Sequence, residues 1–511
     1  MREAQAPPAT ASAPEPLLRW AGRALTGWPA TGVSLAAGGL LVLAFAPFDL
    51  YLLAPAALAL WFALLRGCEP RTSFRHGYAF GLGFFGFGVT WVFNSLLIFG
   101  QAPWVVATLI TGAFVLLLAF YPAVLAWLAA RVAGNAGLLV WLSALAGGYV
   151  LLEGLRGWLL SGFPWLLLGH VLLDSPVRSW IPLGGEAGAG LWVTMLAAAL
   201  VLLLARRLIA AVLLIATLLA GSAVIASWNW VESSGPPLQV AVVQGNIDQG
   251  RKWQDDGIQH ALATYSSLSL PVAGVDLLVW PETAIPAFYA EVYAELDALS
   301  ERLELEGTEL VTGIFDFDPV DRAMYNSIRH LPSGAVYDKR QLVPFGEYLP
   351  LRQRLDWLDR LLDIPMSDLS AGTGDGQMPM AGQVAGLSVC YEAAYARRIR
   401  AALPDATFLL NVSNDAWFGN TLAPHQHLQI ARFRALEAGR PMIRATNTGI
   451  SALIAADGRV TAHSGLFVRE VLQGDVLPHS GVTPAVRFGA WPAFVFSALL
   501  LLPALWSRRR R

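Results

Sequence analysis

Three residues in the second half of the sequence have the types and positions that nucleophilic catalysis needs, namely Glu282, Lys339 and Cys390. Glu282 follows the apolar run 277–280, and Cys390 ends the apolar, β-branched run 386–389. A carboxylate near a thiol in a partly desolvated cleft can take its proton, and a nearby ammonium stabilises the thiolate and the oxyanion that forms on attack. The three residues therefore predict a cysteine nucleophile.

Each of these residues also has an ordinary structural explanation when it is considered alone. A free cysteine is most often a small buried apolar residue, a carboxylate such as Glu282 often caps a helix, and a lone lysine in a strand usually faces solvent. The second cysteine, Cys68, lies far upstream in an arginine-rich loop, so a disulfide with Cys390 is not expected. His425 and His427 lack a third ligand nearby, and no metal site is expected.

The composition indicates a membrane protein with a separate soluble domain. Of the 511 residues, 55% are hydrophobic and only 14% are charged, which is too apolar for a soluble chain of this length. The net charge of -2 provides no basic field, so nucleic acid is not an expected partner. Apolar runs long enough to span a membrane occur at about 32–48, 50–65, 78–99, 104–130, 138–160, 187–205, 208–226 and 488–506. We therefore predict eight transmembrane helices.

Arginine residues fall in every second connection between these runs, which predicts the orientation of the chain. The connectors around Asp49 and at 100–103 carry neither Lys nor Arg. The basic connections contain Arg19 and Arg23, Arg66, Arg71 and Arg75, Arg131, Arg206 and Arg207, and residues 508–511. Because positive charge is retained in cytoplasmic loops, both termini are expected in the cytoplasm and the segment after the seventh run outside it.

The expected organisation has four parts. Residues 1–16 are rich in Ala and Pro and predict a disordered cytoplasmic tail. Residues 17–228 hold the first seven helices, with an apolar interfacial loop at 159–185; residues 229–487 form an α/β domain; and 488–511 hold the last helix and a basic tail. In the α/β domain, strands are expected at 238–244, 275–280, 310–315, 336–342, 386–391, 407–412, 442–446 and 450–455, and helices at 255–267, 287–303, 393–403 and 424–438.

The order Glu, Lys, Cys within one α/β domain resembles the nitrilase superfamily, which implies an α-β-β-α sandwich. With the membrane runs added, nearly the full chain resembles the bacterial apolipoprotein N-acyltransferase family. The further motifs that carry this resemblance are Val243-Gln-Gly-Asn246 leading to Lys252-Trp253, Phe345-Gly-Glu-Tyr-Leu-Pro350, Asn411-Val-Ser-Asn-Asp-Ala-Trp-Phe-Gly419 and Gly162-Phe-Pro-Trp165. His170 departs from the pattern, because a tyrosine is expected there.

The resemblance implies roles for individual residues. Glu282 would be the base, Lys339 the oxyanion stabiliser and Cys390 the acyl carrier; no cofactor is implied. The backbone N–H after Cys390 could also face the oxyanion. Four further residues match positions that the family needs around the site, namely Trp253, Glu347, Tyr391 and Glu392. Glu347 and Glu392 could orient Lys339.

The implied reaction transfers an acyl chain from a phospholipid, through a Cys390 thioester, to the α-amino group of the S-diacylglyceryl cysteine of an apolipoprotein. Its expected place is the bacterial inner membrane, with the catalytic domain in the periplasm. Two alternatives stay open: a membrane-tethered amidase, and a transporter with an inactive nitrilase-like domain. Glu153 and Arg156 lie one helical turn apart, and they either pair with each other or contact a lipid head group.

Overall fold

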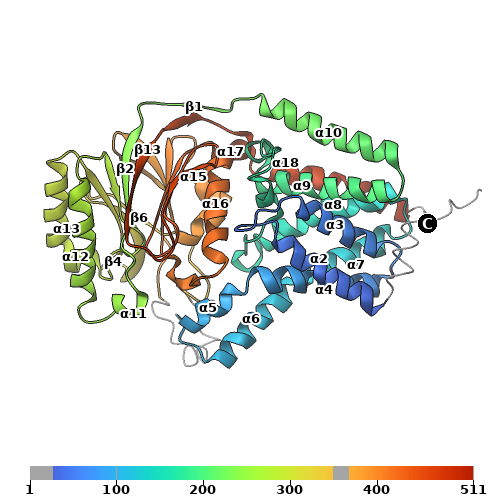
Figure 1. Cartoon of the computed structure of the whole chain (residues 1–511), viewed down its shortest axis with the longest axis horizontal. Helices are drawn as coiled ribbons and strands as arrows, with labels where there is room; N and C mark the ends of the chain where they lie inside the picture. Colours follow the sequence, from blue (N-terminus) through green and yellow to red (C-terminus); the bar gives the residue numbers. More distant parts are fainter. Residues whose placement is uncertain (1–26, 99, 349–367, 510–511) are drawn as a thin grey trace, which may run out of the picture.

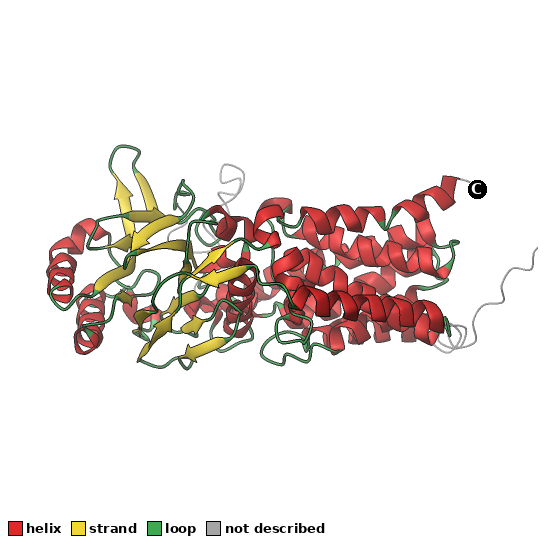
Figure 2. Cartoon of the chain, turned by 90° about the horizontal axis from the view of Figure 1, so that it is seen from above, coloured by secondary structure: helices red, strands yellow, loops and turns green. Residues whose placement is uncertain are grey.

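The computed structural model describes residues 27–98, 100–348 and 368–509. It has two parts that follow one another along the long axis of the molecule, a helical part and a β-rich part (Figures 1 and 2). The predicted tail at 1–16 lies outside the described residues, as do the last two positions of the motif that ends at residue 350.

Each of the eight predicted apolar runs contains helix. The helices are α2 (Trp28–Val42), α3 (Leu53–Leu65), α4 (Pro70–Gly88), α5 (Trp91–Ile98), α6 (Trp104–Leu118), α7 (Phe120–Ala133), α8 (Leu138–Arg156), α9 (Trp180–Leu204), α10 (Leu208–Ala226), α18 (Trp491–Leu499) and α19 (Leu502–Arg509). Among the described residues, four helical segments are long and apolar enough to cross a membrane, and the bent pair of α4 and α5 would make a fifth. The helical part therefore belongs to a membrane protein, and the count of eight spans stays a prediction.

Two differences between the helices and the predicted runs concern where one helix breaks and where another begins. The run 78–99 is broken between α4 and α5, whose axes differ by 49°. Helix α9 begins at Trp180, so its first turn lies within the predicted interfacial loop at 159–185. The helix continues through Gly185 with a backbone kink there, at φ 59°, a conformation that glycine adopts without strain.

Glycines bring α2 and α4 into close backbone contact. A Cβ atom at Gly38 would lie 2.0 Å from the carbonyl oxygen of Phe80, and one at Gly83 would lie 2.0 Å from that of Leu35. Inside a membrane, an apolar side chain is as well solvated by lipid as by a neighbouring helix, so the hydrophobic effect does not drive helices together. Close van der Waals packing at small residues holds such helices together instead.

The β-rich part contains two six-stranded sheets. The first has the order β13-β2-β3-β4-β5-β6 and the second β12-β11-β10-β9-β8-β7. The first is made of β2 (Leu238–Gln244), β3 (Leu277–Val279), β4 (Glu309–Asp318), β5 (Ala323–His330), β6 (Val336–Asp338) and β13 (Glu470–Val476). The second is made of β7 (Gln377–Met380), β8 (Gln383–Val389), β9 (Phe408–Ser413), β10 (Met442–Thr446), β11 (Ala452–Ile454) and β12 (Val460–His463). Strands β1 (Val231–Ser233) and β14 (His479–Gly481) form a separate antiparallel pair.

The alternation of side chains along the strands builds three apolar cores. Val242 and Leu410 belong to the core between the two sheets, whereas their neighbours face outward. Ala241 packs on the helix pair α12 (Gly257–Ser269) and α13 (Tyr289–Glu304). Leu409 packs on α15 (Ala396–Ala401) and α16 (Ala423–Ala438). Because successive residues of a strand point to opposite faces, the result is the expected α-β-β-α order of layers.

All eight predicted strands overlap a strand of the structure, but two boundaries matter for the site. The strand predicted at 336–342 ends at Asp338, so Lys339 follows the strand and does not lie within it. The helix predicted at 393–403 is present as the shorter α15, and a 3₁₀ turn, η4 (Cys390–Ala394), precedes it. Cys390 therefore lies at the corner between a strand and a tight turn.

Candidate active site

Glu282, Lys339 and Glu347 form one charged cluster, in which Glu282 and Lys339 are buried and Glu347 is partly buried. The Nζ atom of Lys339 lies 2.7 Å from Oε1 of Glu347 and 3.5 Å from Oε1 of Glu282. Glu282 follows β3 and Lys339 follows β6, two strands of the same sheet, and both side chains are buried. The structure thus brings together two members of the predicted triad and one predicted supporting residue.

Cys390 sits at the end of β8 in a strained backbone conformation. Its φ is 52°, which side chains other than glycine seldom adopt, and only 8% of the residue is exposed. Burial raises the pKa of its thiol and the charge of Glu282 raises it further, whereas Lys339 lowers it. Glu282 and Lys339 are thus close enough to influence the thiol electrostatically, and its raised pKa means that the thiol needs a base to react at neutral pH.

Lys339 stays charged because of its two carboxylate neighbours. Burial alone would lower its pKa, but Glu347 and then Glu282 more than offset that effect, and the pKa is raised overall. Burial raises the pKa of Glu347, and Lys339 acts against that rise. A permanent ammonium in a site shielded from water is suited to stabilise an oxyanion.

Two asparagines that sequence reasoning missed hold the carboxylate of Glu282. Asn326 donates from Nδ2 to Oε1 over 2.7 Å, and the backbone N–H of Asn414 donates to Oε2 over 2.8 Å. Asn326 lies on β5, a strand that the sequence analysis did not predict. Asn414 belongs to the motif 411–419, so its neighbourhood was indicated although its contact was not.

Glu392 connects the turn of Cys390 to the segment of Lys339 without touching the ammonium. Its Oε1 accepts from the backbone N–H groups of Arg340 and Gln341 over 2.7 and 2.9 Å. Its Oε2 accepts from the hydroxyl of Tyr337 and the N–H of Val389, each over 2.8 Å. Glu392 therefore orients Lys339 through the backbone, whereas Glu347 binds it directly.

Tyr391 and Trp253, the other predicted supporting residues, lie in different surroundings. The Tyr391 ring stacks on Trp165 of the helical part, with centroids 6.0 Å apart, and meets Tyr395 edge-on. Trp253 is 47% exposed, and its ring lies 6.3 Å from that of Phe315. The structure thus places Tyr391 between the site and the helical part and leaves Trp253 on the surface near β4.

Lys252, next to Trp253, is a buried cation that the sequence analysis did not single out. Burial lowers its pKa to about 8, and the charge of Glu282 acts in the opposite direction. A signal was available in the composition: Lys252 and Lys339 are the only two lysines among the 35 basic residues. Both lysines of the chain therefore lie within the electrostatic reach of Glu282.

His427 is buried at the site, but not in a metal-binding arrangement. Its Nδ1 lies 3.0 Å from Oδ1 of Asp415 and its Nε2 lies 3.2 Å from the carbonyl oxygen of Cys390. No cluster of three potential metal ligands occurs among the residues that the structure describes.

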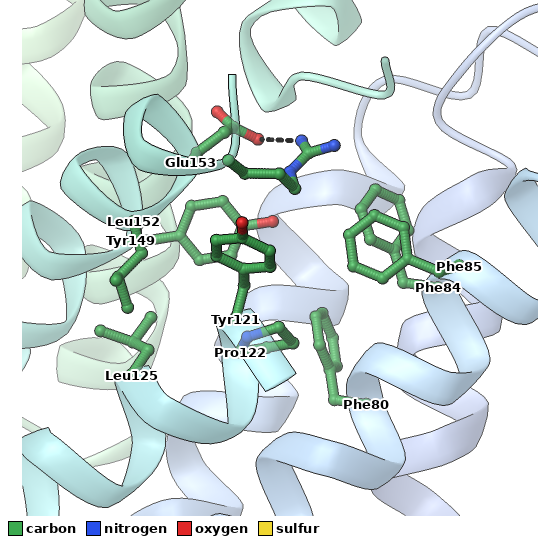
Figure 3. Close-up of a pocket in the computed structure, with 10 residues that line it drawn as sticks. Phe80, Phe84, Phe85, Tyr121, Pro122, Leu125, Tyr149, Leu152 and Glu153 are labelled. Carbon is green, nitrogen blue, oxygen red and sulfur yellow. Dashed lines mark hydrogen bonds and ion pairs between the residues drawn. The ribbon is translucent and has the colours of Figure 1, made fainter. Parts of the chain in front are cut away.

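Glu153 and Arg156 both line an apolar pocket in the helical part, and Glu153 lies at one end of it (Figure 3). Their side chains lie 3.4 Å apart. The other residues of this pocket are Phe80, Phe84, Phe85, Tyr121, Pro122, Leu125, Tyr149 and Leu152. Arg156 also donates to the carbonyl oxygen of Trp165 over 2.6 Å, so it helps to hold the indole against Tyr391. Contact of the pair with a lipid head group stays a prediction.

His170 lies at the junction of the two parts. It is buried, and its Nε2 is 3.3 Å from Oε1 of Glu186 on α9. Glu186 also pairs with Arg434 of α16. His170 therefore packs beside an ion pair between the parts and not beside the triad.

Comparisons with known proteins agree with both parts of the fold. The family model described as "Carbon-nitrogen hydrolase" matches residues 239–481, and the one described as "Apolipoprotein N-acyltransferase N-terminal domain" matches residues 37–199. Fold and site thus define a nitrilase-type catalytic domain joined to a helical membrane domain.

Relatives that match over almost the whole chain identify the family. The apolipoprotein N-acyltransferase of Methylococcus capsulatus is 39% identical, covering 94% of this chain and 96% of its own. Those of Azotobacter vinelandii and Pseudomonas syringae pv. tomato are 40% and 38% identical, each covering 96% of this chain. The chain belongs to the apolipoprotein N-acyltransferase family. Among solved structures, Saccharomyces cerevisiae Nit3 matches with 16% identity and a TM-score of 0.37, covering 48% of this chain and 93% of that one.

Proposed function

We propose that the enzyme transfers an acyl chain from a phospholipid, through a thioester on Cys390, to the α-amino group of the S-diacylglyceryl cysteine that begins an apolipoprotein. Family membership supports N-acylation of lipoproteins as the overall reaction. The observation that carries the residue roles is the cluster in which Lys339 lies 3.5 Å from Glu282 and both groups influence the Cys390 thiol.

In the first half-reaction, Glu282 takes the proton of the thiol as the sulfur attacks the ester carbonyl of the phospholipid. The ammonium of Lys339 and the backbone N–H of Tyr391 stabilise the oxyanion. When the tetrahedral intermediate collapses, the ester C–O bond breaks and Glu282 returns its proton to the leaving alkoxide. The products are a lysophospholipid and the thioester.

In the second half-reaction, the neutral α-amine of the acceptor attacks the thioester carbonyl. Glu282 takes one proton from the attacking nitrogen, the C–S bond breaks, and the proton passes to the departing thiolate. An amide forms and the free thiol is restored. Because one nucleophile serves two bulky amphiphiles in turn, the kinetics are expected to be ping-pong.

The contact between the site and the helical part supports delivery of both substrates from a bilayer. Tyr391, which follows the nucleophile, stacks on Trp165, whose Nε1–H donates to Gln426 over 2.6 Å. The proposed arrangement has eight membrane spans, both termini in the cytoplasm and the catalytic domain in the periplasm. The distribution of arginine residues between the apolar runs supports this orientation.

Intact-mass measurement of purified enzyme tests the proposal. Exposure to phospholipid alone should add the mass of one acyl group, which neutral hydroxylamine removes and which passes to a diacylated lipopeptide after the donor has been removed. Cys390→Ala should form no adduct. Release of free fatty acid without transfer would instead indicate an amidase-like hydrolase, and absence of any adduct would remove Cys390 from the mechanism.

A further inference from the structure

The carbonyl group of Cys390 is held by two buried side chains. It accepts a hydrogen bond from Nε2 of His427 over 3.2 Å and another from Nδ2 of Asn411 over 3.3 Å. Both side chains are fully buried, and Asn411 is fixed in turn by Ser388 on the neighbouring strand. The peptide unit after the nucleophile is therefore restrained by groups that none of the proposed catalytic steps uses.

The neighbours of His427 determine which of its nitrogens carries the proton. The guanidinium of Arg444 lies 3.0 Å from Nδ1, and it can only donate. Oδ1 of Asp415, which can only accept, also lies 3.0 Å from Nδ1, so the neighbours of Nδ1 alone do not decide the tautomer. The carbonyl of Cys390 can only accept, and a neutral ring that bonds to it must carry its proton on Nε2. Burial, and then Arg444, lower the pKa of His427 despite the opposing charge of Asp415, which favours this neutral form.

Asp415 completes the support of the imidazole. Its Oδ2 accepts from Arg444 over 2.8 Å and its Oδ1 from the hydroxyl of Ser413 over 2.7 Å. The rings of Trp165 and Phe418 lie 5.5 and 6.1 Å from the imidazole and cover it with apolar surface. His427 is thus oriented by two charged groups and packed against two aromatic rings.

We propose that His427 is a positioning residue that fixes the peptide unit between Cys390 and Tyr391 and so aims the N–H of Tyr391 at the oxyanion. The peptide unit is planar and trans, so its N–H points opposite to its C=O. Holding the carbonyl oxygen therefore also sets the direction of that N–H. This inference rests on the proposed function, in which Tyr391 N–H is an oxyanion donor. It also explains how Cys390 is kept at a φ of 52°.

Two conservative variants separate the two sides of the imidazole. The amide nitrogen of a glutamine reaches about as far along the side chain as Nε2, whereas that of an asparagine occupies the place of Nδ1. His427→Gln therefore retains a donor for the Cys390 carbonyl, and His427→Asn retains a polar partner for Arg444 and Asp415 but loses the contact with Cys390. The measurements are the single-turnover rate of acyl-enzyme formation at saturating phospholipid, the melting temperature, and hydrogen–deuterium exchange of the peptide that contains residues 389–393.

His427→Asn should form the acyl-enzyme more slowly by roughly 10- to 100-fold. This loss is smaller than the roughly 100- to 1000-fold fall in rate when an oxyanion donor is removed outright, because the N–H of Tyr391 remains but is less well aimed. Its amides in 389–393 should exchange faster, with a melting temperature close to that of His427→Gln. His427→Gln should stay within a few-fold of wild type in both measurements.

Equal losses in the two variants, or exchange in 389–393 unchanged by His427→Asn, would overturn the positioning role. If wild-type enzyme forms no adduct at all, the proposed function fails, and the exchange measurement still decides whether His427 restrains this turn.

Discussion

The carboxylate of Glu392 lies 2.7 Å from the backbone nitrogen of Arg340, so the residue two positions after Cys390 binds the residue directly after Lys339. Strands β8 and β6, which end at these points, belong to different sheets. Four donors converge on the two oxygens of this fully buried carboxylate, from Tyr337, Val389, Arg340 and Gln341. Glu392 thereby joins the turn that carries the thiol to the segment that carries the ammonium.

Glu392→Gln should be strongly destabilising despite its similar shape. The amide has one acceptor oxygen, and its NH₂ group would face donors on the other side, which leaves buried N–H groups without partners. We expect a loss of at least about 2 kcal/mol in the free energy of unfolding, with acyl-enzyme formation falling as well. Glu301→Gln, on the exposed face of α13, is the matched control and should change neither. Wild-type stability in Glu392→Gln would show that the carboxylate does not hold the two segments together.

Lys339 and Glu347 should be coupled in stability. Lys339→Met leaves the partly buried carboxylate of Glu347 without its 2.7 Å partner, which should cost about 3 kcal/mol. Adding Glu347→Gln removes that uncompensated charge, so the double variant should be more stable than Lys339→Met alone. Chemical unfolding of the four proteins gives the coupling energy. Strictly additive losses would mean that the two residues do not stabilise each other.

Glu282→Gln should make the thiol more acidic and the enzyme slower. The charge of Glu282 raises the pKa of Cys390, so its removal lowers that pKa and shifts the alkylation of Cys390 by iodoacetamide to lower pH. Acyl-enzyme formation should nevertheless fall by roughly 100-fold or more, because an amide cannot accept the proton. A Cys68→Ala background leaves Cys390 as the one thiol. If alkylation and acylation change in the same direction, Glu282 is not the base.

Much of the fold could be predicted because its signals are local. The β-branched run before Cys390 and the apolar run before Glu282 are buried strands, and such runs are easily recognised. Strand β5 (Ala323–His330) was missed because several of its buried residues are polar and several of its apolar residues are partly exposed. Its sequence therefore lacks the alternation of apolar and polar residues that marks a strand. One of those buried polar residues is Asn326, which binds the carboxylate of Glu282.

The supporting contacts could not be predicted, for a physical reason. Glu392 binds mainly backbone N–H groups, and His427 binds a backbone carbonyl. Every residue carries such groups, so no residue type in the sequence marks them. The break between α4 and α5 was missed for a related reason, because an apolar run shows its length but not its bend.

Cysteine labelling tests the proposed orientation. In a protein that lacks both native cysteines, Glu301→Cys on the exposed face of α13 should react in intact spheroplasts with a maleimide that cannot cross the membrane. Glu69→Cys, exposed before α4, should react only after the membrane has been made permeable. The arginine residues around position 69 support a cytoplasmic location for that loop. If Glu69→Cys reacts in intact spheroplasts and Glu301→Cys does not, the proposed orientation is wrong and the α/β domain lies in the cytoplasm.

Lys252 should make stability depend on pH above neutrality. Burial lowers its pKa in the folded protein from 10.5 to about 8. Between these values the unfolded chain binds a proton that the folded chain does not, so the free energy of unfolding should rise with pH. Below pH 8 both states are protonated and burial of the charge costs about 3 kcal/mol.

Lys252→Met should therefore melt above wild type at pH 7, with a difference that shrinks toward pH 10. Lys252→Arg, whose guanidinium stays charged, should show no such convergence. A difference between Lys252→Met and wild type that is constant from pH 7 to 10 would contradict the lowered pKa.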